Sequence, residues 1–445
     1  MARKLAAIVM AGGLGTRMRS ATPKHLHPIL GRPLIDWVID ALAPLEPAAT
    51  ILVSSPLTHE RLEGGAADGV SVVVQPEPRG TGDAVAVAQA HIPADCDDIV
   101  VIPGDTPLLT GATLTGLVAT HDSDGASGTV LSFTPPEAGS YGRVVRGAEG
   151  GLERIVEAAD ATPDQLALDE VNSSIYVFRA DALWDTLASV VSDNTQGEQY
   201  LTDVMGLLVE GGHRVSVSHA SDWLSLTGVN TRVELAEVTA GIRDRILESH
   251  MLAGVTLIDP ASTWIDADVS IEPDVTIHPF TVLRGACHVE TGAEVGPHVV
   301  AIDARIGPRA VVGPFAYLRP DADLGEGAKA GTFVEIKNSR LRAGAKVPHL
   351  SYIGDAEIGE GTNIGAGAIT ANYRAERYTS KQRTTIGRNV HTGSQNVFVP
   401  PVSIGDDAWT AAGSTITEDV PGGALAIARA RQVNKERYGE GRKRD

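Results

Sequence analysis

The sequence has little of what marks secreted or membrane proteins. It has only two cysteines, Cys96 and Cys287, which allow at most one disulfide and show no metal-site spacing, so we expect a protein of the reducing cytosol. The apolar stretch at the start is short, leads directly into a glycine-rich loop and has no convincing cleavage site. No segment is long and apolar enough to cross a bilayer, so we expect a cytoplasmic protein without membrane insertion.

Positive charge is also scarce, because 37 Lys and Arg stand against 56 Asp and Glu and leave a formal net charge of −19. A field of this sign repels nucleic acid and anionic lipid, so neither is an expected partner. Any phosphate group must therefore be held by local cations. Phenylalanine is rare, with 6 residues, whereas 48 glycines indicate many tight turns. The length of 445 residues suggests two or three domains.

The first half of the chain alternates short β-branched apolar segments with helical patterns, which is typical of an α/β domain with a mainly parallel sheet. We assign this domain to residues 1–230 and a connecting helix to residues 231–252, where apolar residues recur at helical spacing. The expected strands are LAAIVMA at 5–11, TILVSS at 50–55, VSVVVQ at 70–75, DIVVIPGD at 98–105 and NSSIYVF at 172–178.

Residues 253–445 follow a different rule, because aliphatic residues recur every six positions. A helix cannot produce this period, since its apolar face recurs at three and four residues. Several of the aliphatics precede a glycine, as in Ile306-Gly307, which would relieve the backbone where the chain turns a corner. We predict a parallel β-helix of roughly nine triangular coils, followed by a C-terminal tail; a β-sandwich would show period-two alternation instead. The series includes Ile265, Ile271, Ile277, Leu283, Val289, Val295, Ile306, Val312, Leu318, Leu324, Ala330, Ile336, Leu341, Val347 and Ile353.

The loop MAGGLGTRM, residues 10–18, lies between a predicted strand and a predicted helix. Its backbone N–H groups can point at phosphate oxygens, and Arg17 and Lys24 add full charges. Alone, this loop fits a tight turn with surface cations equally well, and Asp105 alone fits a turn or helix-capping aspartate.

Further motifs follow in a fixed order: PKHLHPILGRPL, QPEPRGTGDAV, PGDTPLL, YGRVVR, EVNSSIYVF, QYLTDV and GVNTRVEL, and then the six-residue repeat. With them, residues 5 to about 435 closely resemble the bifunctional N-acetylglucosamine-1-phosphate uridyltransferase/glucosamine-1-phosphate acetyltransferase family of bacterial cell-wall precursor synthesis. The resemblance implies a Rossmann-like nucleotidyltransferase domain followed by a left-handed parallel β-helix of hexapeptide repeats. It also implies a homotrimer with active sites between subunits.

For the first half, the resemblance implies uridylyl transfer from UTP to N-acetylglucosamine 1-phosphate with release of pyrophosphate. Asp105 and Asn230 look like the Mg²⁺ ligands, since both offer oxygen donors. Gln75, Gly80 and Thr81 would read the uracil. The whole implied set is Met10, Ala11, Gly12, Gly13, Arg17, Lys24, Gln75, Gly80, Thr81, Gly104, Asp105, Gly142, Glu157, Asn172 and Asn230.

Some positions depart from the family pattern. Gly12 replaces a usual alanine, and Leu14 stands where a lysine is common. Pro103 replaces a usual tyrosine and Ser174 a usual glycine beside the sugar pocket, which bears on sugar specificity more than on the reaction.

For the second half, the resemblance implies acetyl transfer from acetyl-CoA to glucosamine 1-phosphate. His349 would take a proton from the attacking amine, with Glu335 orienting it, while Arg319 and Lys337 hold the phosphate. A lone histidine on such a repeat is otherwise a surface residue. The implied sugar-phosphate set is Arg319, Lys337, Tyr352, Asn363, Asn372, Tyr373 and Lys381, and the implied acetyl-CoA set is Ala366, Ser394, Ala412 and Arg429.

Two other functions fit parts of the sequence. One is a sugar-1-phosphate nucleotidyltransferase with a β-helix that only oligomerises or regulates, and the other is a carbohydrate-binding scaffold without catalysis. His349 with Arg319 and Lys337 separates the bifunctional enzyme from the first, and the ordered nucleotidyl motifs disfavour the second. A small insertion near residues 374–380, just before Lys381, could alter acetyl-donor affinity or a subunit contact.

Overall fold

The computed structural model describes residues 3–13, 15–65, 67–192, 194–373 and 381–439. The chain divides into two compact units, Met1–Ile242 and Arg243–Asp445, and the division falls inside helix α8 (Arg232–Leu252). The bounds predicted from the sequence, 1–230, 231–252 and 253–445, stay a prediction. None of the described helices has the length and apolar character that crossing a bilayer requires. Leu14 and the insertion at 374–380 lie outside the described residues.

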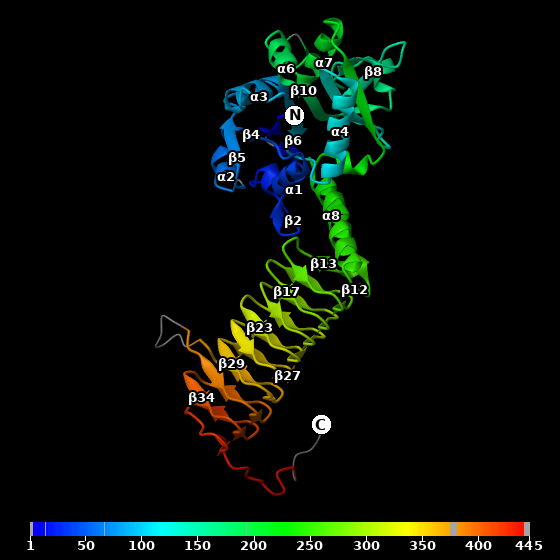
Figure 1. The fold of residues 1–445 in the computed structure, drawn as a ribbon. Helices are drawn as coiled ribbons and strands as arrows, with labels where there is room; N and C mark the ends of the chain where they lie inside the picture. Colours follow the sequence, from blue (N-terminus) through cyan, green and yellow to red (C-terminus); the bar gives the residue numbers. More distant parts are fainter. Residues whose placement is uncertain (1–2, 14, 66, 193, 374–380, 440–445) are drawn as a thin grey trace. The chain divides into compact units, whose positions relative to one another are not determined.

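The first unit is built on one twisted sheet in which the first strand lies in the interior, between β6 and β4 (Figure 1). Strand β10 is antiparallel to both of its neighbours, whereas the four strands from β6 to β5 are all parallel. The sheet is therefore mixed, with its parallel part as expected. Its path is β11 (Val215–Ala220), β7 (Gly128–Phe133), β10 (Val171–Arg179), β6 (Asp98–Pro103), β1 (Leu5–Ala11), β4 (Thr50–Ser54) and β5 (Val70–Val74), with β8 (Arg143–Arg146) and β9 (Leu152–Val156) attached beside β10.

Helices cover both faces of this sheet, which explains why its strands are continuously apolar and do not alternate. In β1, Ala6 and Ile8 pack in a cluster with side chains of α3, α6 and α7. Ala7 and Val9 point the opposite way and are equally buried. The helices are α1 (Leu34–Asp40), α2 (His59–Glu63), α3 (Thr81–Ala88), α4 (Gly111–Asp124), α5 (Pro163–Leu166), α6 (Ala180–Leu187) and α7 (Leu201–Glu210).

The carboxyl ends of the parallel strands carry the motifs singled out in the sequence. The glycine-rich loop follows β1, Gly104 and Asp105 follow β6, and Gln75 follows β5. Because these strands are parallel, the three segments leave the sheet at the same edge, which is where α/β sheets bind ligands.

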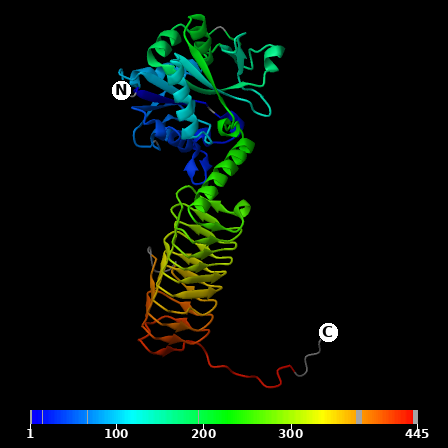
Figure 2. The ribbon, with the colours of Figure 1, turned by 45° about the vertical axis from the view of Figure 1, so that its right-hand side comes forward.

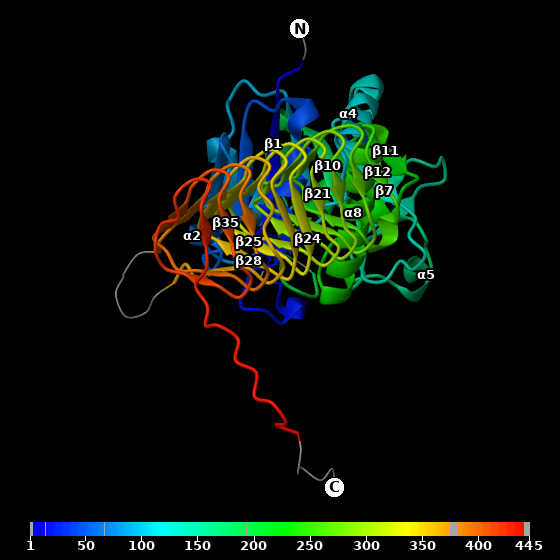
Figure 3. The same ribbon diagram turned by 90° about the horizontal axis from the view of Figure 1, so that it is seen from below.

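The second unit is a parallel β-helix, as predicted (Figures 1 and 2). Its short strands stack into three flat faces, and Figure 3 shows the coils seen close to end on. The first face holds β12 (Thr256–Leu257), β15 (Thr276–Ile277), β18 (Glu294–Val295), β21 (Val311–Val312), β24 (Lys329–Thr332) and β27 (Lys346–His349), and continues through Asn363 to β32 (His391–Thr392), β35 (Trp409–Thr410) and β37 (Leu425–Ala426).

The other two faces complete each coil. The second face is β13 (Trp264–Ile265), β16 (Val282–Arg284), β19 (Val300–Ile302), β22 (Tyr317–Leu318), β25 (Glu335–Lys337), β28 (Tyr352–Gly354), β30 (Ile369–Thr370), β33 (Val397–Phe398) and β36 (Thr415–Ile416). The third face is β14 (Ser270–Ile271), β17 (His288–Val289), β20 (Arg305–Ile306), β23 (Ala322–Leu324), β26 (Ser339–Leu341), β29 (Ala356–Ile358), β31 (Thr384–Ile386) and β34 (Val402–Ile404).

The six-residue series fills the interior of this coil. Ile277, Leu318 and Ile336 are fully buried, and the whole predicted series lies in or against one apolar cluster. The nine strands of the second face agree with the predicted number of coils. The glycines after the aliphatics permit close stacking at the corners: a Cβ on Gly307 would lie 2.5 Å from the carbonyl oxygen of Leu324 on the next coil.

We expect Gly307→Ala to lower the free energy of unfolding of the β-helix by about 2 kcal/mol, because the added methyl group must displace a backbone carbonyl. The matched control is Gly116→Ala in α4, where nothing lies within 4 Å of the added atom and alanine favours the helix. Urea unfolding followed by circular dichroism measures both variants. Equal stability of the two would contradict the steric account of the corner glycines.

Candidate active sites

Three predicted residues of the first unit meet around one ammonium group. The Nζ atom of Lys24 donates a hydrogen bond to the carboxylate of Asp105 and another, of 3.2 Å, to Oδ1 of Asn230. The backbone N–H of Val229 donates to the carbonyl of Asp105 at 2.8 Å, which fixes the neighbouring Asn230 beside it. Two oxygen donors thus face a single cation, which is the donor chemistry that a magnesium ion requires.

Local backbone geometry brings Lys24 to this place. Gly15 has a φ of 61°, and a Cβ on it would lie 2.7 Å from the Cβ of Lys24, so glycine is required on both counts. Lys24 is buried although it is a cation. Burial, with a smaller contribution from the charge of Lys24, lowers the pKa of the adjacent His25 to about 4, so that histidine is neutral near pH 7. The positive charge facing Asp105 is therefore that of Lys24.

The glycine-rich loop and the loop after β6 lie side by side. The N–H of Gly104 donates to the carbonyl of Met10 at 2.8 Å, and the Cβ of Ala11 lies 3.2 Å from the position of an added Cβ on Gly104. Gly13 is exposed, and so is Arg17, in the short helix η1 (Thr16–Met18). The structure thus places the loop residues at one edge of the sheet.

The predicted uracil readers lie between β5 and α3. Gln75 is buried, and its Nε2 donates to the carbonyl of Gly80 at 3.0 Å and to Oδ2 of Asp83 at 2.8 Å. The hydroxyl of Thr81 accepts a hydrogen bond from the N–H of Leu201 at 2.9 Å and so caps α7. Thr81 therefore has a structural bond of its own, and Asp83 is a site neighbour that the sequence did not single out.

The predicted sugar-binding set also comes together. The N–H of Asn172 donates to the carbonyl of Gly142 at 2.8 Å, and a Cβ on Gly142 would lie 3.4 Å from Oε2 of Glu157. Asn172 Nδ2 donates to the hydroxyl of Tyr176 at 2.7 Å, and Thr202 donates to Glu157 at 3.1 Å. Sequence reasoning missed Tyr176 because NSSIYVF looks like an ordinary buried strand.

Two departures from the family pattern are placed around this set. Ser174 has a φ of 61° at a register shift in β10, a backbone conformation that favours glycine, and its N–H donates to Oδ1 of Asn172 at 3.0 Å. Asn172 is therefore held at both ends of its amide. Pro103 is the last residue of β6 and is half-buried.

In the second unit, predicted cations share the second face. Arg319 directly follows β22, and Lys337 ends β25, the next strand on that face. The adjacent ammonium group of Lys381 lowers the pKa of Lys337, with burial contributing less. Two ammonium groups held this close, with a guanidinium nearby, favour an anion of high charge such as a phosphate group.

Tyr352 and Asn372 lie on the same face, whereas Glu335 does not have its predicted contact. Asn372 Nδ2 donates to the Tyr352 hydroxyl at 3.4 Å and to the carboxylate of Asp355. Glu335 accepts a hydrogen bond of 2.8 Å from Arg319, and among the described residues it has none with His349. The carboxylate of Glu335 is thus paired with the Arg319 guanidinium, and its role in orienting His349 stays a prediction.

His349 begins a column of predicted acetyl-CoA residues along the corner between the first and second faces. Gly367 N–H donates to the His349 carbonyl at 3.1 Å, Gln395 to Ala366 at 2.7 Å, and Gly413 to Ser394 at 2.9 Å. Ala412 precedes Gly413, and the side chain of Arg429 lies 3.9 Å from an added Cβ there. Asn363 lies on the adjacent first face, and Tyr373 is exposed beside the undescribed insertion.

Comparison with known proteins places these clusters in a family. Residues 7–194 match the model of the MobA-like NTP transferase domain. The bifunctional protein GlmU of Streptomyces coelicolor is 48% identical, with 98% of this chain and 94% of that protein covered. GlmU of Streptomyces avermitilis is 47% identical with the same coverage, and that of Mycolicibacterium vanbaalenii is 44% identical with 98% and 92% covered. The chain belongs to the GlmU family.

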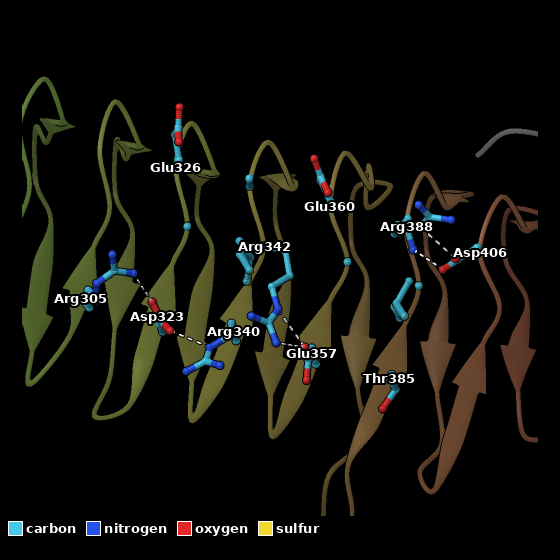
Figure 4. A pocket seen from close by; sticks show the side chains of 16 residues that line it. Arg305, Asp323, Glu326, Arg340, Arg342, Glu357, Glu360, Thr385, Arg388 and Asp406 are labelled. Atoms are coloured by element: carbon cyan, nitrogen blue, oxygen red, sulfur yellow. Dashed lines mark hydrogen bonds and ion pairs between the residues drawn. The ribbon is translucent and has the colours of Figure 1, made fainter.

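The β-helix of this GlmU-family chain also has a hollow away from the His349 corner. A cavity of about 740 Å³ opens on the third face of the β-helix, where Arg305, Asp323, Arg340 and Glu357 form a row (Figure 4). Each arginine there has a carboxylate partner, as in the bonds of 2.9 Å and 2.7 Å that Arg305 and Arg340 make to Asp323. Exposed ion pairs of this kind contribute little to stability, and the paired arginines offer no free positive charge to a ligand. The hollow is therefore not a candidate site.

Glu157 gives the first unit a pH dependence of known sign. Burial raises its pKa above 4.5, an effect opposed by the bond from Thr202 and reinforced by nearby carboxylates. The protonated form is therefore favoured on folding, so its contribution to stability is present below pH 4.5 and is lost as the pH rises through the raised pKa.

We expect Glu157→Gln to raise the free energy of unfolding at pH 7, and the difference from the wild type to vanish near pH 4. The control is Glu170→Gln. Burial alone would raise the pKa of Glu170, but bonds from Arg146 and Ser132 lower it overall, so its loss should destabilise at pH 7 and matter less in acid. Urea unfolding at the two pH values measures both. A Glu157→Gln protein less stable than wild type at pH 7 would contradict the expectation.

Proposed function

We propose that the chain is a bifunctional enzyme of UDP-N-acetylglucosamine biosynthesis in the bacterial cytoplasm. It transfers an acetyl group from acetyl-CoA to glucosamine 1-phosphate in its second unit and uridylyl from UTP to the resulting N-acetylglucosamine 1-phosphate in its first. The observation that carries this proposal is the presence of two cationic sites, the buried ammonium group of Lys24 and the cluster around Lys337, in a chain that aligns with bifunctional relatives over 98% of its length. Both cysteines are free, which fits a reducing compartment.

In uridylyl transfer, which we assign to the first unit, the protein positions two anionic substrates and offsets the charge that develops. The loop from Met10 to Gly13, Arg17 and Lys24 would hold the triphosphate of UTP. Asp105 and Asn230, whose oxygens accept hydrogen bonds from the Lys24 ammonium group, would hold Mg²⁺. When bound, the ion neutralises charge on the phosphate oxygens. Gly142, Glu157 and Asn172 would bind the sugar.

In acetyl transfer, which we assign to the second unit, His349 would accept a proton from the amine of glucosamine 1-phosphate. The amine nitrogen then forms a bond to the thioester carbonyl carbon of acetyl-CoA, the carbon–sulfur bond breaks, and the thiolate leaves as CoA and takes up a proton. Arg319, Lys337 and Lys381 would hold the sugar phosphate. Ala366, Ser394, Ala412 and Arg429 would contact the acetyl-CoA that lies along the corner.

We also propose a homotrimer, supported by an exposed apolar ridge along the same corner. The rings of Phe280, His298, Phe315 and Phe333 stack with centroids 4.7, 4.7 and 5.2 Å apart, and Leu350 continues the line. Phe315 is 47% and Phe333 57% exposed. A contiguous apolar patch of this kind favours contact with another subunit. The ridge ends at the coil of His349, so the acetyl sites would lie at subunit boundaries.

A sugar nucleotidyltransferase with an inert β-helix is not favoured, and one histidine separates the two functions. We expect His349→Ala to lower kcat for acetyl transfer by about 10²- to 10⁴-fold while leaving pyrophosphate release from UTP and N-acetylglucosamine 1-phosphate unchanged. The control is His288→Ala, at a histidine on the third face whose side chain is 42% exposed. Free thiol and pyrophosphate are followed separately. Unimpaired acetylation by His349→Ala would remove the assigned base.

The double variant Phe315→Asp and Phe333→Asp tests the trimer. Charges on the ridge should repel the neighbouring subunit, so we expect monomers by analytical ultracentrifugation and loss of most acetyl transfer, with pyrophosphate release retained. Ile258→Asp, at a side chain that is 56% exposed elsewhere on the β-helix, should leave the assembly intact. A double variant that remains trimeric would show that the ridge is not the subunit contact.

A further inference from the structure

The side chain of Gln75 is anchored from one side only. Its Nε2 donates to the carbonyl of Gly80 and to the carboxylate of Asp83, at 3.0 and 2.8 Å. Both partners are acceptors and neither carries a proton to give, so the amide nitrogen, not the oxygen, must face them. The orientation of the Gln75 amide is thereby decided by chemistry.

The amide oxygen consequently faces the nucleotide loop. A Cβ on Gly12 would lie 3.2 Å from Oε1 of Gln75, which places this oxygen against the glycine-rich segment after β1. Among the described residues no donor bonds to Oε1, so it presents a free acceptor. Because Gly12 has no side chain where the family usually has a methyl group, the space beside that acceptor is open.

A fixed acceptor at this position discriminates between pyrimidines. Uracil presents its N3–H group, from which Oε1 can accept a hydrogen bond. Cytosine presents N3 as an acceptor, and two lone pairs would then face each other. At the N3 position, only a reversed amide, with Nε2 toward the loop, would suit cytosine. Reversal would turn Oε1 toward the Asp83 carboxylate and the Gly80 carbonyl, leaving three acceptors together without a proton.

We propose that Asp83 is a positioning residue that locks the Gln75 amide and so selects uracil over cytosine at the nucleotide site. The inference rests on the proposed uridylyl transfer, since it assigns a role to a neighbour of the uracil reader. Gly80 contributes a neutral acceptor through its backbone, but the carboxylate is the stronger of the two restraints. Asp83 does not touch the substrate and acts through Gln75 alone.

The other role open to Asp83 is to stabilise α3, because it lies in the first turn of that helix, where a negative charge is favourable. Asp181 lies in the first turn of α6 and accepts a hydrogen bond of 2.8 Å from the N–H of Ala182, with no glutamine amide to orient. Asp181→Ala therefore reproduces the loss of a helix-turn carboxylate without the loss of the amide lock.

The experiment compares Asp83→Ala, Asp83→Ser, Asp83→Asn and Asp181→Ala in the full-length protein. Pyrophosphate release is measured with N-acetylglucosamine 1-phosphate and either UTP or CTP. We expect Asp83→Ala to lower the UTP-to-CTP ratio of kcat/KM by about tenfold, mainly through KM, since a bond to a charged group is lost. Asp83→Ser should lower this ratio by a similar factor, because a hydroxyl can donate or accept a hydrogen bond and permits either amide orientation.

Rescue separates a positioning role from a structural one. Asp83→Asn keeps a side-chain oxygen that can accept from Nε2, so it should retain the ratio within about threefold. Asp181→Ala should keep the ratio of the wild type, and acetyl transfer should be unchanged in all variants. An unaltered ratio in both Asp83→Ala and Asp83→Ser, or an equal fall in Asp181→Ala, would overturn the inference.

A failure of the proposed function would look different. Wild-type protein that releases no pyrophosphate from UTP would refute uridylyl transfer, and the selectivity of the site is then measured as the ratio of calorimetric Kd values for UTP and CTP. A wild-type preference for UTP that falls in Asp83→Ala still supports the amide lock. A ratio that the variant leaves unchanged overturns it.

Discussion

Holding positive charge at a fixed place in a chain of strongly negative net charge is the constraint on which both candidate sites depend. The chain carries a net charge of −19, so its overall field disfavours the phosphorylated partners that it would have to bind. Local clusters offset that field at two places. Lys24 is buried with its charge compensated by Asp105, whereas the ammonium groups of Lys337 and Lys381 lie close together, with the carboxylate of Asp355 nearby. A phosphate group that binds at the second site directly offsets the repulsion between its two ammonium groups. At the first site a phosphate group has to compete with the carboxylate of Asp105.

A rigid backbone holds the charged residues of both sites in place. At the sheet edge, the carbonyl of Asp105 is tied to Val229 and that of Met10 to Gly104, so the loops that carry charge are fixed by backbone bonds and not by the side chains that would bind ligand. On the β-helix the same result follows from stacking: Arg319 and Lys337 occupy the same position on successive coils, so their spacing is set by the strand ladder. The same ladder of backbone hydrogen bonds builds the column of predicted acetyl-CoA residues at the His349 corner. The aromatic ridge stops before this column, which begins at small residues such as Ala366.

The repeating parts of the structure could be read from the sequence, and the irregular parts could not. Aliphatic residues that recur every six positions, such as Ile277 and Leu283, indicate the coils of a β-helix. The apolar runs of β1 and β6 indicate a buried sheet. The register shift of β10 at Ser174 left no periodic signal, because a left-handed residue other than glycine is invisible in a pattern of hydrophobicity. The antiparallel course of that strand was missed for the same reason.

Site residues divide along the same line. Glycines, lysines and Asp105 stand in motifs whose order is specific, so resemblance could name them. Glu335 was assigned to His349, but a nearby guanidinium competes for its carboxylate, and such a competition depends on which side chains share a column of the coil. Tyr176 and Asp83 escaped because each acts on another side chain: one holds the amide of Asn172 and the other that of Gln75. Amide orientation is a property of a network of donors and acceptors, and no single position in a sequence carries it.

The amides of Asn172 and Gln75 each depend on a neighbouring group for their orientation. Asn172 accepts a hydrogen bond from the backbone N–H of Ser174 at the register shift of β10, and Gln75 donates one to Asp83 in the first turn of α3. A side chain that meets the substrate is constrained by the substrate's own donors and acceptors. Its anchor is constrained only to present the complementary group, and several residue types can do so. The proposed amide lock therefore assigns the selection of uracil to a pair of side chains, the contacting amide of Gln75 and the carboxylate of Asp83 behind it.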